Sequence, residues 1–430
     1  MTYEEAVAYL HSLQRVGVKL GLERTQELLR RLGRPDRRAG RIIHITGTSG
    51  KGSVSAMVES CLRAAGHKVG LYTSPSLERF TDRFQINRED MPEADLARLT
   101  QRIKAEAEAM VAEGLEQPTE FEVTTALGFL YFAEQQVDWL VLEVGVGGRY
   151  DATNVVELPA VACITNIGLD HTDWLGDTHE KIAWEKVGII KPAVPCVTGT
   201  DHPGALAVIR EEAVANDSVL AEVTGDDWQI DQFGPDGQVV DLLGARGWYR
   251  GIQLPLLGKH QAANAAVALR VLELAGVSEQ RIRAGLAQVR WPGRMELIRV
   301  PYGPAVLLDA AHNPPKCRAL AEAVREYFPG RRVLLVMGAL ADKNVADMAA
   351  PLLDTADQVW ATTPESPRRM MAADLGALCR EVGREVNVVP DIHSAVDQAL
   401  QAACPKDLVV ITGSFYTVGP ARRHIRQKND

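Results

Sequence analysis

Short apolar runs rich in β-branched residues alternate with helical patterns along the first part of the chain. SVSAMVESCLRAAG (53–66) and FEVTTALGFLYFAEQQ (121–136) have the periodicity of helices. Because strands and helices alternate, these residues predict a parallel, doubly wound sheet. The runs typical of its buried strands are RIIHITG (41–47), KVGLYTS (68–74), DWLVLEVG (138–145) and AVACITNIG (160–168).

Residues 226–256 follow a different pattern. WQIDQF and QVVDLL flank the turn residues 234–237, GPDG, which predicts a hairpin, and WYRGIQLPL can add a third antiparallel strand. A helix is expected from about His260 to Ala275. The segment WPGRMELI (291–298) combines Trp, Pro and Gly between two periodic regions, and we interpret it as a domain boundary.

Beyond this segment the alternation resumes, with helical stretches at 315–327 and 393–403. The predicted fold class is therefore α/β, with a mostly parallel N-terminal sheet, a small antiparallel element and a C-terminal Rossmann-like domain. We expect the domains to span 1–292 and 293–430. The strands expected in the second domain are AVLLDAA (305–311), RVLLVMG (332–338), QVWATTP (358–364), VNVVPD (386–391) and DLVVITGS (407–414).

Composition narrows the classes of protein that fit. The 430 residues carry a formal charge of -9, which argues against binding to nucleic acid or an anionic membrane surface. No apolar run approaches the roughly 18 residues of a spanning helix. The acidic start resembles neither a signal nor a transit peptide. Six cysteines without CxxC spacing indicate free thiols, so we expect a cytoplasmic protein.

A glycine-rich turn, GTSGKGS at residues 47–53, lies between a predicted strand and a predicted helix. Its backbone N–H groups and the helix N-terminus are suited to phosphate oxygens; Lys51 can reach the β- and γ-phosphates, and Ser53 can bind Mg²⁺. The spacing departs from the common P-loop, because Ile45 takes the first glycine position and Gly52 is inserted before the serine. An ordinary turn is the alternative, but the lysine in this context favours a phosphate site.

Polar residues also lie at the ends of the third and fourth predicted strands. Glu143 ends WLVLEV, and Asp170 and His171 follow AVACITNIG. Ligands of open parallel sheets lie beyond the carboxyl ends of strands, so Glu143 is a candidate Mg²⁺ ligand. A capping glutamate and a hydrogen-bonded structural histidine are the alternatives. Lys186, from its own surroundings in the sequence, is interpreted as a surface lysine of a helix.

Seven motifs in order give the chain a resemblance to the folylpolyglutamate synthases, which belong with the bifunctional dihydrofolate synthases to the Mur ligase superfamily. The resemblance covers about residues 40 to 420. It implies a ligase that uses ATP to join L-glutamate to folate, and also to dihydropteroate, through an acyl phosphate. The motifs are GTSGKGS, LEVGVGGRYDATN, LDHTDWLG, EKVGIIKP, PGRME, LLDAAHNP and ITGSF.

The resemblance also implies roles for single residues, including a carbamate formed from CO₂ on Lys186. It implies catalytic roles for Lys51, His171, Lys186, Arg294 and His312. It implies two Mg²⁺ sites formed by Ser53, Ser74, Glu143, His171 and Lys186. It implies nucleotide contacts from Gly47, Thr48, Ser49, Gly50, Lys51, Gly52, Ser53, Asn264, Arg294 and Asp309. From the residues alone, Arg294 is equally a linker salt bridge, Asp309 a strand-end cap and His312 a neighbour of a helix N-cap.

On the acceptor side, the resemblance implies substrate contacts from Phe121, Glu122, Arg149, Asp151, Ala152 and Ser414, and it implies a monomer. Ser49 and Ser76 depart from the usual Asn and His of the family.

Three alternative functions stay open at this point. A ligase of the same superfamily can act on a peptidoglycan precursor, although only 40 residues precede the first strand, too few for a UDP-binding domain. A P-loop kinase or NTPase and a nucleotide-gated binding protein are the others. The second α/β domain is unexpected in a P-loop kinase, and the candidate metal ligands at adjoining strand ends are unexpected in a binding protein without catalysis.

Overall fold

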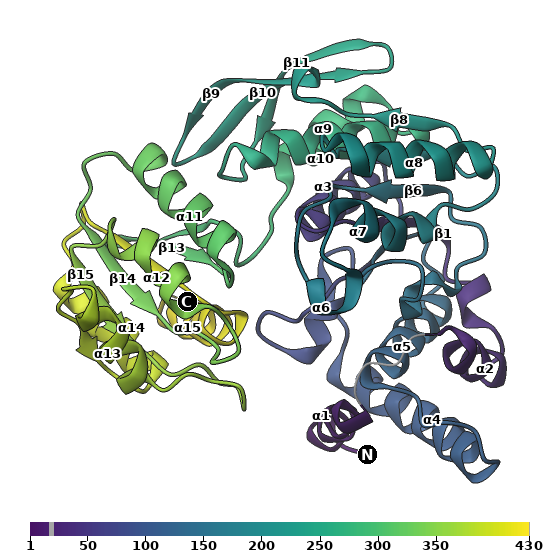
Figure 1. Cartoon of the computed structure of the whole chain (residues 1–430), viewed down its shortest axis with the longest axis horizontal. Coiled ribbons are helices and arrows are strands. Elements are labelled where there is room, and N and C mark those ends of the chain that lie inside the picture. Colours follow the sequence, from purple (N-terminus) through teal and green to yellow (C-terminus); the bar gives the residue numbers. More distant parts are fainter. Residues whose placement is uncertain (17–20, 430) are drawn as a thin grey trace.

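The computed structural model describes residues 1–16 and 21–429, and these form two α/β domains, each built around its own sheet (Figure 1). We call them the N-terminal and the C-terminal domain. A three-stranded antiparallel sheet lies on the N-terminal domain, at the top of Figure 1. The predicted fold class is confirmed.

The N-terminal domain contains an eight-stranded sheet with the order β4-β3-β2-β5-β1-β6-β7-β8. From β2 to β8 all neighbours are parallel, and β3 and β4 add an antiparallel edge. All four predicted strands are present, each over a shorter range. The strands are β1 (Arg41–Thr46), β2 (Val69–Tyr72), β3 (Phe84–Ile86), β4 (Glu89–Asp90), β5 (Trp139–Glu143), β6 (Val161–Ile164), β7 (Cys196–Thr198) and β8 (Leu220–Glu222).

Alternate side chains of the central strands pack on opposite faces of this sheet, as strand geometry requires. Ile43 and Ile45 of β1 face a core that includes α3 (Lys51–Ala64), α9 (His260–Leu274) and α10 (Glu279–Gln288). Ile42 faces the other side, where two further cores lie. The remaining helices of the domain are α1 (Tyr3–Ser12), α2 (Glu23–Arg31), α4 (Glu93–Ala112), α5 (Glu120–Glu134), α6 (Thr172–Leu175), α7 (His179–Lys186) and α8 (Pro203–Ala215).

The predicted hairpin forms the three-stranded sheet, in the order β11-β10-β9. Its strands are β9 (Trp228–Gly234), β10 (Gly237–Gly244) and β11 (Gly247–Leu254). The turn between β9 and β10 is the predicted one, and Gly237 takes a φ of 125° there. Val240 and Leu242 of β10 join the core around α9.

The C-terminal domain contains a six-stranded sheet with the order β12-β13-β17-β14-β15-β16, flanked by helices on both faces. The predicted strands are all present, and β12 is additional, because the segment interpreted as a boundary also pairs antiparallel with β13.

None of the helices within residues 1–16 and 21–429 is long and apolar enough to cross a membrane. The bounds of the elements in the C-terminal domain are as follows. The strands are β12 (Glu296–Arg299), β13 (Ala305–Asp309), β14 (Val333–Met337), β15 (Gln358–Ala361), β16 (Asn387–Val388) and β17 (Leu408–Thr412). The helices are α11 (Pro314–Tyr327), α12 (Val345–Leu353), α13 (Ala372–Glu381), α14 (Ile392–Ala402) and α15 (Phe415–Asn429).

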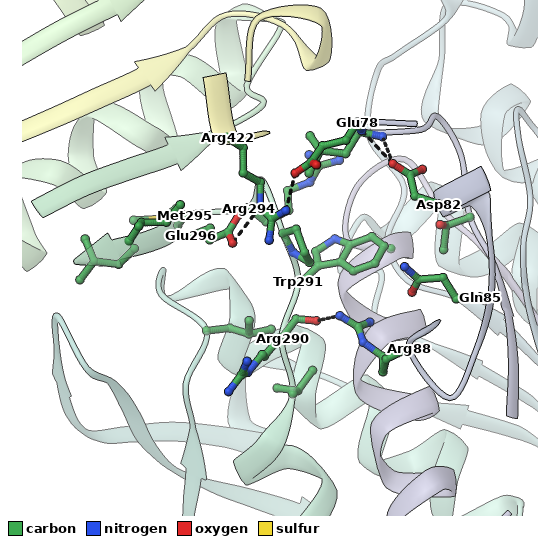
Figure 2. Close-up of a pocket in the computed structure, with 18 of the residues that line it drawn as sticks. Glu78, Asp82, Gln85, Arg88, Arg290, Trp291, Arg294, Met295, Glu296 and Arg422 are labelled. Atoms are coloured by element: carbon green, nitrogen blue, oxygen red, sulfur yellow. Dashed lines mark hydrogen bonds and ion pairs between the residues drawn. The ribbon is translucent and has the colours of Figure 1, made fainter. Parts of the chain in front are cut away.

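Helix α15 joins the two domains through Arg422. Its guanidinium group forms ion pairs with Glu78, in the loop after β2, and with Glu296 of β12, where Nε lies 2.7 Å from Oε2 (Figure 2). The backbones are also close, since a Cβ on Gly419 would overlap the carbonyl oxygen of Leu77. The loop after β2 is therefore held by both domains.

We expect Gly285→Ala to loosen the packing of α10 on α3. A Cβ at this position would lie 2.3 Å from the Cα of Cys61, which is backbone and has little freedom to move. The free energy of unfolding should fall by about 1–3 kcal/mol, the usual cost of overpacking a core. Gly225→Ala is the control, because its Cβ meets nothing within 4 Å. Equal denaturation midpoints for the two variants would contradict this packing.

Candidate active site

A glycine turn joins β1 to α3. At two of its positions, Gly47 and Gly50, close contacts leave no room for a side chain. Gly47 has a φ of 151°, and a Cβ there would lie 1.9 Å from Thr165 Oγ1. Gly50 is the N-cap of α3 with a φ of 81°, and its Cβ would lie 2.4 Å from Asn264 Oδ1. The turn therefore presents backbone N–H groups and the N-terminus of a long helix, which is the arrangement of phosphate sites.

The segment after β6 holds this turn in place. Asn166 accepts hydrogen bonds from Thr48 N with its carbonyl oxygen at 3.0 Å and from Ser49 N with Oδ1 at 2.7 Å. Thr165 Oγ1 donates to the carbonyl of Ser49 at 2.6 Å. Asn166 is missing from the sequence-based prediction, because it falls inside the predicted strand 160–168, whereas β6 ends at Ile164.

Lys51 and Ser53 lie in the first turn of α3. Lys51 Nζ donates to the carbonyl of Gly47 at 3.0 Å, so the ammonium group lies against the glycine turn. Ser53 is buried, and its Oγ accepts from Gln261 Nε2 at 3.2 Å. Asn264 Nδ2 in turn donates to Gln261 Oε1 at 3.0 Å. Helix α9 thus brings Asn264, an expected nucleotide contact, next to the turn.

Glu143 ends β5 directly beside β1, where its Cα pairs with that of Ile45. The carboxyl group is buried, and Oε2 accepts from Ser74 N at 3.3 Å. Burial raises the pKa of this carboxyl group, and the positive charges of Lys51 and Arg294 oppose that effect. A buried carboxylate next to a serine and the glycine turn is suited to a hard divalent cation.

His171 and Lys186 complete the edge of the sheet. His171 lies in the left-handed region, with a φ of 52°. Partial burial lowers the pKa of its imidazole; Asp170 opposes this, while Lys51 and Lys186 add to it. Lys186 is only 3% exposed, and burial lowers its pKa to about 7. The interpretation of Lys186 as a surface lysine is wrong, because α7 packs this side against the sheet.

Arg294 faces both domains from the linker between α10 and β12. Loss of hydration lowers the pKa of its guanidinium group, and the carboxylates of Asp309 and Glu143 act in the opposite direction. Asp309, at the end of β13, accepts from Met295 N and Ala311 N, both at 2.8 Å. The carboxylate of Asp309 therefore also shapes the linker, as its strand-end alternative predicts.

His312 and Ser414 follow β13 and β17, which are neighbours in the C-terminal sheet. His312 Nδ1 lies 2.8 Å from the carbonyl of Ala310, and its ring centroid lies 5.6 Å from that of Phe415. The guanidinium of Arg294 lies over the same Phe415 ring, at 4.6 Å from the centroid. Ser414 is buried beside them. The predicted C-terminal contacts thus converge around Phe415.

Phe121, Asp151 and Ala152, expected on the acceptor side, lie around the loop that follows β5. A Cβ on Gly145 of this loop would lie 2.5 Å from Phe121 Cζ. Asp151 and Ala152 are both buried. The Asp151 carboxylate accepts from Val146 N at 3.0 Å and so holds the loop.

Glu122 and Arg149, the other two expected acceptor contacts, have protein partners. Glu122 Oε2 accepts from Thr119 N at 2.7 Å in the cap of α5, and Glu122 also pairs with Arg24 at 3.0 Å. The guanidinium of Arg149 lies over the ring of Trp184, 4.2 Å from its centroid. In this structure both side chains therefore contact other residues of the protein.

The two domains enclose a cavity of about 1000 Å³. Figure 2 shows Trp291 in the middle of its wall, between Arg88 and Arg294. Trp291 lies on the linker, and a Cβ on Gly52 would lie 2.6 Å from its ring. Glu143 and Ser74 line the same cavity. The linker therefore packs directly on the helix that carries the glycine turn, and the cavity reaches the predicted metal ligands.

Comparisons with known proteins agree with this arrangement. The profile of the Mur ligase middle domain matches residues 45–272, and that of the Mur ligase glutamate ligase domain matches residues 293–415. A Bacillus subtilis protein named dihydrofolate synthase/folylpolyglutamate synthase is 36% identical, and the match covers 99% of each chain. The chain belongs to the Mur ligase family.

Among solved structures, the chain is similar to folylpolyglutamate synthases. Folylpolyglutamate synthase from Thermotoga maritima has a TM-score of 0.89 at 36% identity, covering 99% of this chain and 97% of that one. Escherichia coli FolC in complex with DHPP and ADP has a TM-score of 0.84 at 33% identity, covering 99% and 98%. This Mur ligase is therefore an ATP-dependent ligase. The alternatives of a P-loop kinase or NTPase and of a binding protein without catalysis do not agree with this result.

Two glycines of this Mur ligase at the ends of α3 allow a matched test of the turn. Gly50→Ala adds a Cβ that meets Asn264, whereas Gly66→Ala, at a φ of 92°, meets nothing within 4 Å. Both variants pay roughly 1–2 kcal/mol for the left-handed backbone. Only Gly50→Ala should weaken nucleotide binding, by about tenfold or more, in calorimetric titrations. Equal nucleotide affinity in both variants would contradict the predicted phosphate site.

Proposed function

We propose that this ligase joins L-glutamate to folate, and also to dihydropteroate, by activating the acceptor carboxylate as an acyl phosphate. The observation that carries the proposal is the cavity between the domains, which Gly52 of the glycine turn, Ser74 and Glu143 line on one side and Arg294 of the linker on the other. The names of the relatives, and the E. coli complex with DHPP and ADP, support the same substrates.

Two Mg²⁺ ions fit the donor set of the N-terminal wall. Glu143 offers a buried carboxylate, Ser53 and Ser74 offer hydroxyl groups, and His171 offers an imidazole whose pKa is lowered. Among the described residues no group of three His, Cys, Asp or Glu side chains could hold a metal ion by itself, so phosphate oxygens and a modified lysine would complete the shells. Bound Mg²⁺ supplies positive charge to the phosphate oxygens.

A carbamate on Lys186 fits its surroundings. CO₂ combines with the neutral amine, and a pKa of about 7 leaves about half of the side chain neutral at that pH. The nearby positive charge of Lys51 disfavours an ammonium group at this position and would favour an anion. Lys186 would then present an anionic oxygen toward the metal sites.

The residues divide the reaction between the two domains. Lys51 and Arg294 would hold the γ-phosphate while an oxygen of the acceptor carboxylate attacks phosphorus and ADP leaves. The amino group of glutamate, held near Ser414, then attacks the acyl carbon. The new amide bond forms as phosphate leaves and the amine loses a proton. Because the acyl phosphate reacts readily with water, closure of the two domains over the cavity would protect it.

Other expectations stay predictions. We propose that the division into 1–292 and 293–430 separates a P-loop ATPase and folate-binding domain from a ligase domain. Asp151 and Ala152 hold dihydropteroate in this proposal, and Phe121 and Glu122 lie near the pterin. We also propose a monomer in the cytoplasm, where the six free cysteines would stay reduced.

Lys51→Ala should lower phosphate release by roughly 100-fold or more, because a phosphate-binding cation is lost. The assay contains ATP and glutamate, with dihydropteroate or tetrahydrofolate as acceptor, and product analysis identifies the amide. Lys406→Ala, an exposed lysine of the C-terminal domain, is the control and should keep full activity. Near-normal turnover in Lys51→Ala would remove the phosphate assignment, and a silent wild type with every acceptor would remove the ligase proposal.

Lys186→Ala should also lose roughly 100- to 1000-fold of turnover, and added acetate should restore part of it by standing in for the carbamate. Isotopically labelled bicarbonate gives an independent readout, since a carbamate signal should appear in the wild type and disappear in the variant. Full activity of Lys186→Ala, or the same carbamate signal in both proteins, would contradict the assignment.

A further inference from the structure

Lys316 is a cation in the first turn of a helix, where the positive end of the helix dipole disfavours it. Asn313 caps α11, and its Oδ1 accepts from the backbone N–H of Lys316 at 3.0 Å. The backbone position of Lys316 is therefore fixed by the cap. A residue that opposes its local electrostatics is expected where function requires it.

The side chain of Lys316 points to His312. Nζ lies 3.2 Å from His312 Nε2, and the other ring nitrogen, Nδ1, lies 2.8 Å from the carbonyl of Ala310. An ammonium group can only donate, so Nε2 accepts from it, and Nδ1 carries the proton that the carbonyl accepts. While this bond exists, the Nε2 of His312 has no proton to donate to a phosphate. The group in position to contact a phosphate is therefore the Lys316 ammonium that is bound to His312, and not His312 itself.

The charges around Lys316 come from both domains. Burial first, and then the charges of Arg294 and Lys51, lower its pKa to about 8, while Asp170 and Asp309 oppose them. Lys51 belongs to the glycine turn, and Asp170 precedes the candidate metal ligand His171. Lys316 is therefore within electrostatic range of the predicted phosphate site, from the C-terminal domain. Three cations that repel one another at this place are stabilised when an anion lies between them.

We propose that Lys316 contacts an anionic oxygen of the reacting substrates, and that His312 is the residue that positions it. The oxygen belongs either to the phosphoryl group in transfer or to a carboxylate of the incoming glutamate. The inference rests on the proposed ligase function and adds a residue that the motifs of the chain do not contain.

Lys316→Met tests the contact, because it keeps the length of the side chain and removes the charge. Turnover should fall, or a KM should rise, by roughly 10- to 100-fold, the range for a lost hydrogen bond to a charged group. Lys316→Arg should restore most of the loss. Arg318→Met, an exposed position on the same helix, removes the same charge away from the cavity and should change nothing.

Kinetics with ATP and glutamate varied separately identify the oxygen. A rise confined to the KM for glutamate assigns Lys316 to its carboxylate, whereas a lower kcat or a higher KM for ATP assigns it to the phosphoryl group. If Lys316→Met still ligates with wild-type kinetics, the inference about Lys316 is wrong, while the proposed function stands. A wild type that forms no amide overturns the proposed function instead.

A double-mutant cycle tests the positioning role of His312. His312→Leu and Lys316→Met should each lower activity, and the double variant should be little worse than Lys316→Met alone. Effects that multiply in the double variant would show that His312 acts independently, and would overturn its role. His312→Asn, whose side-chain oxygen can still accept from Nζ, provides a second variant if His312→Leu has a lowered thermal midpoint.

Discussion

The geometry of the site depends on how closely the backbone of the glycine turn approaches the residues beside it. Between β1 and α3 the chain runs so near Thr165 and Asn264 that a Cβ on Gly47 or Gly50 would overlap them. These contacts bring three elements to one point: the start of α3, the segment after β6 and the first turns of α9. The predicted nucleotide and metal contacts are near one another because this turn is tight.

A second constraint is the amount of positive charge gathered between the glycine turn and the linker. Lys51, Lys186, Arg294 and Lys316 come from four different segments, and burial lowers the pKa of the last three, with further lowering by neighbouring cations for both lysines. Such a group repels itself and costs stability in the free protein. The energy is recovered when polyanionic substrates bind, which favours binding of nucleotide and acceptor over an empty cavity.

Local signals in the sequence predicted the parts of the fold that depend on neighbouring residues. β-branched runs gave the central strands, and the glycines with Lys51 gave the turn. β12 was missed because the Trp-Pro-Gly of its segment reads as a linker, while its pairing with β13 is set by tertiary contacts. Lys186 was misread for a related reason: the helix surface it occupies is buried by a sheet whose order the sequence does not reveal. Lys316 lies outside the sequence motifs, and it is identified by its contact with His312 in the structure.

The loop after β2 extends the argument from residues to domains. Near its start the N–H of Ser74 donates to Glu143, and at Glu78 the loop meets Arg422 of α15. Since Arg422 also pairs with Glu296, the position of this candidate metal ligand depends on contacts in both domains. The cations on the C-terminal wall depend on the same interface, because Arg294 lies on the linker beside Glu296. A change in the angle between the domains would therefore move the phosphate contacts and Ser74 together, which makes the interface itself a condition of catalysis.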